Sequence, residues 1–257
     1  MKKIDGYDFF VDAHEVNQPD DMDVFQRNVI EDQYGLRDKN IINSIPKVIF
    51  DCGSHIGAFS YVAKSLWPDS LTVLIEPNFY SLEIAKENIQ QVSKNNSIFI
   101  EGGIWYGDKK PKYFTRNEYT KTSSKFVGET MGYYDTKVEK YYQESLLMDE
   151  PYIHKDEGID VYKIEDIMNF LEIDYIDILK LDIQEAEYDF FKKTSLTSDD
   201  IGLFVGELHD CSFYPTDTFE EKSKLLTDRF DKHTVVSRQR QMQGGEEKYV
   251  FYAKREK

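Results

Sequence analysis

The first residues that suggest a chemistry are two carboxylates, each at the end of an apolar run, and the two glycines that lie between them. The apolar run 48–50 ends in Asp51, Gly53 and Gly57 follow it, and a second apolar run ends in Glu76. This order indicates a buried strand, a tight turn and a helix, the arrangement with which α/β folds open a nucleotide-type pocket. An acid at the tip of the second strand is placed to bind both ribose hydroxyls of an adenosine ligand. We therefore predict a pocket for a ligand that contains adenosine.

The glycine spacing distinguishes between kinds of adenosine ligand. A dinucleotide turn needs G-x-G-x-x-G, whose middle glycine lets the backbone approach a pyrophosphate. In that register the chain has Gly53, His55 and Ala58. Asp51 would repel a phosphate, but its charge suits a ligand with a cationic end, such as the α-amino group of S-adenosylmethionine. We therefore expect S-adenosylmethionine as the cofactor.

A second group of ionisable side chains follows two apolar runs in the C-terminal half. Asp182 ends the first of these runs, and Glu207 and His209 end the second. Ligands in open α/β sheets lie outside the carboxyl ends of the strands, so these side chains are expected beside the methyl group of the cofactor. We favour His209, with an ordinary pKa of about 6.5, as the base that takes a proton from an acceptor hydroxyl, which Asp182 positions. Asp182 and Glu207 could instead hold a hard cation such as Mg²⁺.

Alternating strands and helices must position these residues. Strands are expected near 47–51, 71–76, 97–101, 176–182, 201–208, 233–238 and 247–254, and helices near 57–66, 80–93, 164–171, 185–193 and 217–229. Strands that alternate with helices are typical of a mostly parallel sheet with helices packed against it.

The glycine turn and the acid after it resemble the first two motifs of class I S-adenosylmethionine-dependent methyltransferases, at residues 51–57 and Glu76. This resemblance implies an α/β, Rossmann-like fold: a mostly parallel seven-stranded sheet, helices on both faces and a C-terminal antiparallel hairpin. The last two expected strands, joined through residues 243–246, would form that hairpin. His55 is an atypical residue for the first loop.

Three further motifs are similar to those of the FkbM-like family within this class. They are Ile-Glu-Pro-Asn at 75–78, Lys-Leu-Asp-Ile-Gln-Glu-Ala-Glu at 180–187 and Glu-Leu-His at 207–209. The family patterns that they resemble are E-P-N, K-x-D-[IV]-E-G-x-E and E-x-H. The chain departs from the second pattern at Gln184 and Glu185, where the family has glutamate and glycine.

The resemblance also implies an activity, because FkbM-like proteins methylate hydroxyls on sugars and polyketides. We expect an S-adenosylmethionine-dependent O-methyltransferase whose acceptor is a small molecule, in particular a sugar or glycan precursor. Gly103 and Ile104 lie where the family has a strand end beside the adenine. The implied cofactor-binding residues are Asp51, Gly53, Ser54, His55, Gly57, Glu76, Pro77, Gly103, Ile104 and Asp182.

The chain divides into an expected N-terminal helical lead, residues 1–45, and a methyltransferase domain, residues 46–257. Within the domain, residues 106–158 are rich in tyrosine and do not fit the alternation. A stretch of this length without periodicity is usually functional or disordered, and tyrosines argue against disorder. It could be a lid over the acceptor, or a surface elaboration or contact between copies, and the oligomeric state is left open.

Composition limits the partners. With 48 acidic and 32 basic residues, the chain has a formal net charge of −16. Such a surface repels phosphate backbones, so we expect no nucleic acid partner. No apolar run approaches the length of a membrane span, so we expect no membrane insertion. The first residues lack the apolar core of a signal peptide, which favours a cytoplasmic location.

Two alternative functions are weighed against methyl transfer. Tyr188-x-x-x-Lys192 imitates the Tyr/Lys pair of short-chain dehydrogenases and would suit an NAD(P)-dependent oxidoreductase, although the glycine spacing opposes that function. The departures at Gln184 and Glu185 would suit a non-catalytic subunit that binds an adenosine cofactor.

Overall fold

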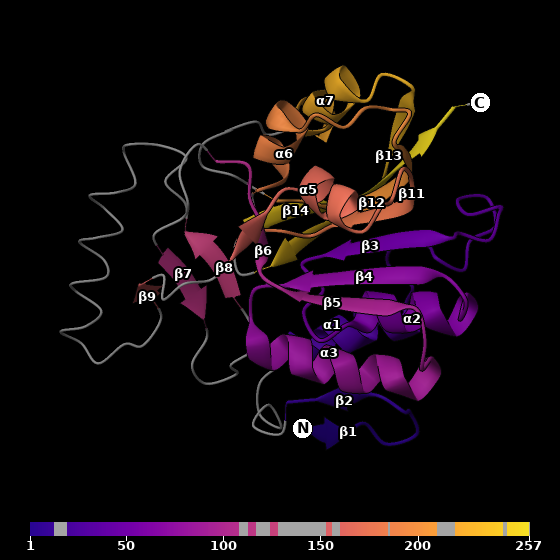
Figure 1. Ribbon diagram of the computed structural model, residues 1–257, viewed down its shortest axis with the longest axis vertical. Helices are drawn as coiled ribbons and strands as arrows, with labels where there is room; N and C mark the ends of the chain where they lie inside the picture. Colours follow the sequence, from indigo (N-terminus) through magenta and orange to yellow (C-terminus); the bar gives the residue numbers. More distant parts are fainter. Residues whose placement is uncertain are drawn as a thin grey trace.

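A seven-stranded sheet forms the centre of the molecule in the computed structural model, with the strand order β13-β14-β12-β11-β3-β4-β5 (Figure 1). The structure describes residues 1–12, 20–107, 113–116, 124–127, 153–155, 160–184, 186–209, 219–243 and 246–256. The strands of the sheet are β3 (Val48–Cys52), β4 (Leu71–Glu76), β5 (Ser97–Glu101), β11 (Ile176–Leu181), β12 (Ile201–His209), β13 (His233–Gln243) and β14 (Glu246–Arg255). From β12 to β5 all neighbours run parallel, whereas β14 is antiparallel to β12 and β13. This confirms the predicted mostly parallel sheet with a C-terminal antiparallel hairpin.

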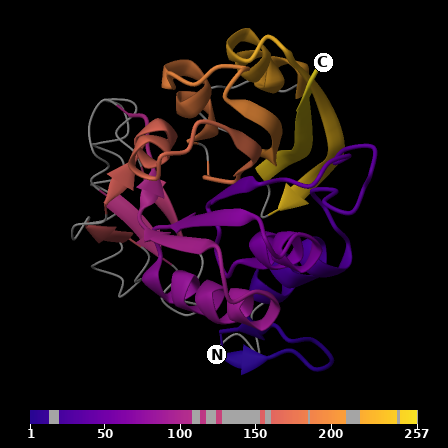
Figure 2. The ribbon, with the colours of Figure 1, turned by 45° about the vertical axis from the view of Figure 1, so that its right-hand side comes forward.

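Helices cover both faces of the sheet, as predicted (Figures 1 and 2). One face carries α2 (Ala58–Leu66) and α3 (Phe79–Val92), and the other carries α5 (Ile164–Phe170), α6 (Glu187–Lys193) and α7 (Phe219–Arg229). Successive strand residues point to opposite faces. In β3, Ile49 therefore packs in the core cluster that includes α2, and Phe50 packs in the cluster that includes α6 and α7. Within the described ranges, no helix has the length and apolar character needed to cross a bilayer.

The described part of the N-terminal lead packs against α2 and α3. It contains the short strands β1 (Lys2–Lys3) and β2 (Phe10–Val11), the helix α1 (Asp20–Phe25) and the π-helix η2 (Gln26–Ile30). The Phe9 ring lies 5.2 Å from the Phe25 ring and 5.1 Å from the Tyr61 ring of α2, measured between centroids. The Asn88 side chain of α3 bonds the backbone N–H and C=O of Phe10 at 2.5 and 3.0 Å. The lead is thus fixed to the domain, and the boundary at 45/46 stays a prediction.

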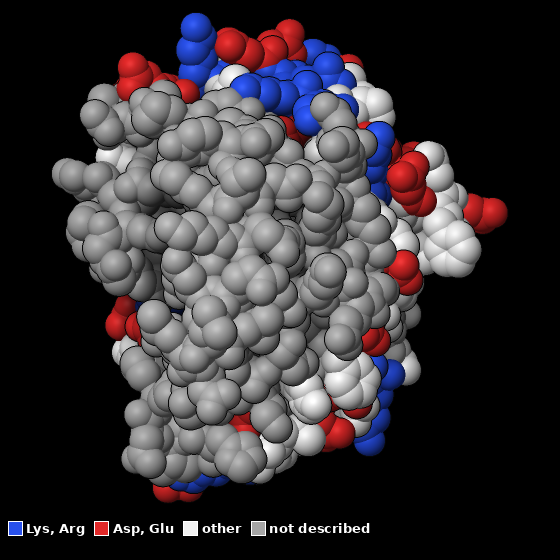
Figure 3. Space-filling view, turned by 90° about the vertical axis from the view of Figure 1, so that its left-hand side faces the viewer, with Lys and Arg blue, Asp and Glu red and all other residues white. Residues whose placement is uncertain are grey.

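The tyrosine-rich segment 106–158 is described only in part. Two-residue strands β6 (Gly103–Ile104) and β10 (Val161–Tyr162) pair in parallel at its two ends. Between them, β7 (Tyr113–Arg116), β8 (Ser124–Val127) and β9 (Ile153–Lys155) form a small antiparallel sheet, to the left of the central sheet in Figure 1. The remaining residues of 108–159 lie outside the described ranges. Figure 3 views the molecule from this side, and the described charged side chains surround the part that is not described. The role of 106–158 stays a prediction.

Candidate active site

The turn after β3 has the backbone that its glycines predict. Gly53 and Gly57 have φ angles of +74° and +76°, a region that glycine adopts without strain. A Cβ atom on Gly53 would lie 1.9 Å from the carbonyl oxygen of Asp182, and one on Gly57 would lie 2.9 Å from the Cβ of Ala85 in α3. The N–H of Gly53 donates to the carbonyl of Ile75 at the end of β4, at 3.0 Å. The turn therefore brings the ends of β3, β4 and β11 together.

The predicted ribose acid lies directly against this turn. Glu76 is buried, and its two carboxylate oxygens accept from the backbone N–H groups of His55 and Asn78, each at 2.9 Å. Burial raises the pKa of Glu76, and its interactions with His55 and with the two backbone donors oppose that rise. The carbonyl of Glu76 accepts from the N–H of Gly102, which places Gly103 and Ile104 beside it. The structure thus brings together the residues expected around the adenosine.

The rest of the turn is held by buried polar contacts. Ser54 is buried and donates its N–H to the carbonyl of Ile75 at 3.1 Å, and Pro77 directly follows Glu76. The ring Nε2 of His55 lies 3.6 Å from Oδ1 of Asp21 in α1. The atypical histidine of the first loop therefore contacts the N-terminal lead.

Asp51 is fully buried, and its charge is compensated within the protein. Ser60 donates to its Oδ2 at 2.6 Å, and Nζ of Lys180 lies 3.2 Å from its Oδ1. Lys180 also donates to the carbonyl of Gly53 at 2.5 Å. Burial opposes the positive charge, but Asp51 and Asp182 outweigh it and raise the pKa of Lys180. Asp51 thus holds the turn in place, and its expected contact with the cationic end of the cofactor stays a prediction.

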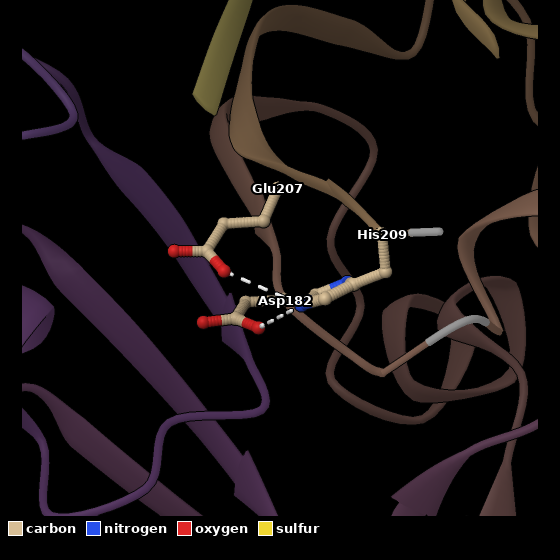
Figure 4. Close-up of side chains that lie close together, drawn as sticks. All are labelled: Asp182, Glu207 and His209. Carbon is tan, nitrogen blue, oxygen red and sulfur yellow. Dashed lines mark ion pairs between the residues drawn. The ribbon is translucent and has the colours of Figure 1, made fainter. Parts of the chain in front are cut away.

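The three residues proposed for catalysis meet at the carboxyl ends of β11 and β12 (Figure 4). Nε2 of His209 lies 3.3 Å from Oε2 of Glu207 and 3.6 Å from Oδ1 of Asp182. Glu207 and His209 are 1% and 7% exposed, and the Asp182 side chain is 23% exposed. The proximity inferred from the strand ends is therefore present in the structure. We call these three residues the acid–imidazole cluster.

The other ring nitrogen of His209 is held from outside the cluster. Its Nδ1 lies 3.2 Å from Oε1 of Glu187, which is fully buried at the start of α6 and also accepts from the N–H of Ile183 at 2.9 Å. Burial alone would lower the pKa of His209, but Glu187, Glu207 and Asp182 together raise it to about 10. These carboxylates therefore favour the protonated imidazole at neutral pH. This differs from the ordinary value on which the prediction of a free base depended.

Two residues of the N-terminal lead also reach the cluster. The hydroxyl of Tyr34 lies 3.3 Å from Oδ2 of Asp182 and 3.5 Å from Oε1 of Glu207, and it can donate to one of them at a time. Nη1 of Arg27, in η2, lies 3.4 Å from Oε1 of Glu207. Sequence reasoning did not find Arg27 or Tyr34, because neither belongs to a motif and both contacts join distant parts of the chain.

The departures from the family pattern lie beside the cluster. Nε2 of Gln184 lies 3.2 Å from Oδ1 of Asp182 and 3.2 Å from Nε2 of His209. Gln184 has a φ angle of +54°, a backbone conformation that is uncommon for a residue other than glycine. Its polar side chain therefore enters the site from a left-handed backbone position. Glu185 lies outside the described residues.

The tyrosine that suggested a dehydrogenase has a structural contact instead. Tyr188 is buried, and its hydroxyl donates to the backbone carbonyl of His209 at 2.7 Å. Since this bond fixes the end of β12, Tyr188 supports the acid–imidazole cluster and offers no basis for an oxidoreductase.

Three solved structures with a similar fold are methyltransferases by name. Magnesium protoporphyrin IX methyltransferase from Synechocystis PCC 6803, with bound S-adenosylmethionine, has a TM-score of 0.48 and 9% identity, over 94% of this chain and 85% of that chain. Precorrin-6y C5,15-methyltransferase from Geobacter metallireducens GS-15 has a TM-score of 0.44 and 13% identity, over 98% and 96%. Methyltransferase FkbM from Methylobacillus flagellatus KT has a TM-score of 0.45 and 11% identity, over 84% of this chain and 46% of that chain. Similarity at this level identifies no ligand or substrate for this chain.

Sequence comparison gives a more specific result. No curated protein matches the chain significantly. A family model described as the methyltransferase FkbM domain matches residues 51–229, which include the glycine turn, Glu76 and the acid–imidazole cluster. Because this match covers more than half of the chain, the protein belongs to the FkbM family of S-adenosylmethionine-dependent methyltransferases.

Proposed function

We propose that this protein transfers a methyl group from S-adenosylmethionine to a hydroxyl of a sugar or glycan precursor. The observation that carries the proposal is that the acid–imidazole cluster directly adjoins the cofactor turn. The backbone of Asp182 touches Gly53, and the N–H of Asp182 donates to the carbonyl of Cys52 at 3.2 Å. Groups that can orient a hydroxyl and hold its proton therefore stand beside the turn that would hold the methyl donor.

The residues around the turn fit the cofactor. Glu76 would accept hydrogen bonds from the ribose, since its carboxylate is fixed at the end of β4 and its oxygens retain acceptor capacity. Gly53, Ser54, His55 and Gly57 would form the backbone cradle. Pro77, Gly103 and Ile104 would contact the adenine, and Asp51 and Asp182 the amino-acid end. The bound cofactor would supply an electrophilic methyl group.

The acid–imidazole cluster offers two ways to handle the acceptor proton. His209 could accept it, provided that the imidazole has first lost the proton that its carboxylate neighbours stabilise. Alternatively, Asp182 and Glu207 could hold a divalent cation such as Mg²⁺, which would orient and acidify the hydroxyl. In both cases the protein positions the acceptor oxygen and excludes water, which is the main contribution that an enzyme makes to such a displacement.

The choice of acceptor is supported by charge and by the resemblance to FkbM-like proteins. A formal net charge of −16 disfavours polyanionic acceptors, whereas neutral sugars are not repelled. If residues 106–158 form a lid, their tyrosines would suit the faces of sugar rings. Action in the cytoplasm is part of the same proposal.

A transfer assay tests the proposal. The purified full chain would be incubated with S-adenosylmethionine that carries a labelled methyl group and with a panel of neutral sugars, glycosides and glycan precursors. We expect label on a hydroxyl oxygen of at least one of these acceptors, and none with the Glu207→Gln variant. Methylation of nitrogen or carbon in the product, or no transfer to any hydroxyl acceptor by protein that binds the cofactor, would contradict it.

A further inference from the structure

We propose that Asp182, Glu207 and His209 together bind one divalent cation, with His209 as a ligand rather than as the base. The ligand atoms would be Oδ1 of Asp182, Oε2 of Glu207 and Nε2 of His209. Groups from these three residues lie within 4.8 Å of one another, and the histidine nitrogen is 3.3 and 3.6 Å from the two oxygens. Adjacent ligands of a six-coordinate cation with bonds of about 2.1–2.3 Å are about 3.0–3.3 Å apart. Small side-chain movements would therefore complete one face of a coordination sphere.

The orientation of His209 is an independent observation that points to a cation. A metal-bound histidine almost always donates its other ring N–H to a carboxylate or carbonyl, which fixes its tautomer. Here Glu187, fully buried and outside the three ligands, lies 3.2 Å from Nδ1. The N–H of Ile183 donates to the same Glu187 oxygen and fixes it in turn. When a cation takes the place of the proton on Nε2, the ring would keep its other proton on Nδ1, facing Glu187, and Nε2 would be free to coordinate.

The second oxygen of each carboxylate is also held from outside. Oδ2 of Asp182 lies 3.3 Å from the Tyr34 hydroxyl and 3.7 Å from Nζ of Lys180. Oε1 of Glu207 lies 3.4 Å from Nη1 of Arg27. All three candidate ligands thus have one polar atom fixed by a neighbour and the other directed toward a common point. Ligands fixed in this way are typical of metal sites.

The charges around the cluster favour a cation as well. Glu187, Glu207 and Asp182 supply three carboxylates around the single imidazole of His209, and the neighbouring Arg27 and Lys180 side chains are shared with other acids. Nε of Arg27 lies 2.9 Å from Oδ2 of Asp23, and Nζ of Lys180 lies 3.2 Å from Oδ1 of Asp51. Buried negative charge is costly unless it is paired. A divalent cation at the common point would balance it.

The ligand types indicate which cation would bind. Mg²⁺ and Ca²⁺ prefer oxygen ligands, whereas imidazole suits first-row transition metals. One imidazole with two carboxylates therefore favours a cation such as Mn²⁺ over Mg²⁺. Gln184 could add a neutral oxygen, because its amide nitrogen lies 3.2 Å from both Oδ1 of Asp182 and Nε2 of His209 and rotation of the amide would exchange the two atoms. The chemical purpose of this cation rests on the proposed function, in which it would orient and acidify the acceptor hydroxyl.

Mn²⁺ is the probe for the test, because its binding is measured without cofactor or acceptor. The full chain, treated with a chelator and then freed of it, would be titrated with Mn²⁺ and followed by electron paramagnetic resonance. We expect one bound Mn²⁺ per chain, with pulsed spectra of the wild-type protein showing coupling to an imidazole nitrogen. Mg²⁺ should compete only at higher concentrations. The absence of specific Mn²⁺ binding, or of the nitrogen coupling in the bound state, would overturn the proposal.

Variants separate ligands from positioning residues. His209→Ala and Glu207→Gln should abolish specific Mn²⁺ binding, whereas Glu187→Gln should weaken it by about 10- to 100-fold. Glu220→Gln, at an exposed position in α7, is the matched control and should bind Mn²⁺ like the wild type. Circular dichroism would confirm that each variant is folded, and unchanged binding by folded His209→Ala would contradict its role as a ligand.

The two proposals fail in different ways. Methyl transfer that persists in chelator without added metal would overturn the cation's role in orienting and acidifying the hydroxyl and leave the proposed function standing. Specific Mn²⁺ binding together with no transfer to any hydroxyl would count against the proposed function and leave the cation site standing.

Discussion

At the scale of single residues, the site depends on carboxylates whose oxygens are already engaged before any ligand binds. Glu76 illustrates this, because two backbone N–H groups fix its orientation. A carboxylate fixed in this way loses little freedom when it accepts further hydrogen bonds from ribose hydroxyls, so binding costs less conformational entropy. Its contribution to cofactor binding should therefore be large for a single side chain.

Replacing Glu76 by alanine tests this contribution. We expect Glu76→Ala to weaken the binding of S-adenosylmethionine and S-adenosylhomocysteine by at least about 1.5 kcal/mol, the scale of a hydrogen bond to a charged group. Isothermal titration calorimetry measures the change. Glu83→Ala, on the surface side of α3, is the control and should bind like the wild type. If Glu76→Ala and Glu83→Ala bind the cofactor with equal affinity, Glu76 is not part of the cofactor site.

The same residue should make stability depend on pH. Burial raises the pKa of Glu76 above its ordinary value of 4.5. Its carboxyl group therefore contributes stability that is fully present below 4.5 and is lost as the pH rises through the higher folded-state value. Glu76→Gln does not titrate, so the free energy of unfolding of this variant, relative to the wild type, should increase as the pH rises across this window.

Urea unfolding of the ligand-free protein at several pH values measures this difference. Glu83→Gln, at a position where the side chain is 44% exposed, supplies the reference for a glutamate on the surface side of α3. A relative stability of Glu76→Gln that stays constant or decreases with pH would contradict the predicted sign.

At the scale of helices and strands, the N-terminal lead completes both halves of the site. Asp21 of α1 contacts His55 in the cofactor turn, and Arg27 of η2 contacts Glu207. A π-helix such as η2 is rare and frequently lies at a functional site. Because α1 runs directly into η2, one continuous segment connects the cofactor turn with the acid–imidazole cluster.

Asn88 anchors the beginning of this segment, which leads to a prediction. Its buried side chain bonds Phe10 twice and donates to the carbonyl of Ile56 in the cofactor turn at 2.8 Å. Asn88→Ala removes the side-chain partner of one buried and two part-buried backbone groups, so we expect a loss of about 2–4 kcal/mol in the free energy of unfolding. Chemical denaturation measures it. Gln91→Ala, at an exposed position of the same helix, should change stability by less than about 0.5 kcal/mol, and a similar value for Asn88→Ala would contradict the anchoring role.

Sequence patterns predicted the elements that carry the site better than they predicted its side-chain contacts. Among the described residues, the strands of the central sheet and the helices α2, α3, α5, α6 and α7 were all expected, because buried strands leave continuous apolar runs and amphipathic helices leave apolar residues at helical spacing. The meeting of Asp182, Glu207 and His209 followed from the strand ends. Arg27 and Tyr34 were missed, because a contact between distant residues leaves no periodicity in the chain. Glu187 was expected at the start of a helix, which is correct, but its contact with His209 depends on tertiary packing.

At the scale of the whole molecule, the excess of acidic residues leads to a prediction about partners. With a formal net charge of −16, the protein should not bind single-stranded RNA at physiological salt. Fluorescence anisotropy with a labelled oligonucleotide measures this, and a basic RNA-binding domain serves as the positive control. Binding with a Kd of about 10⁻⁶ M or tighter, weakening with added salt, would contradict the expectation.

The contact between Arg27 and Glu207 has a consequence for the time at which the site is assembled. The two residues are separated by 180 positions in the chain. During synthesis at about 5–20 residues per second, roughly 9–36 seconds pass between the addition of the first and of the second. The segment before residue 51, where the family match begins, therefore leaves the ribosome long before its partner Glu207 is made. Because Lys180 and Asp182 also hold the cofactor turn, the nascent protein completes neither the turn nor the acid–imidazole cluster before β11 and β12 have been made.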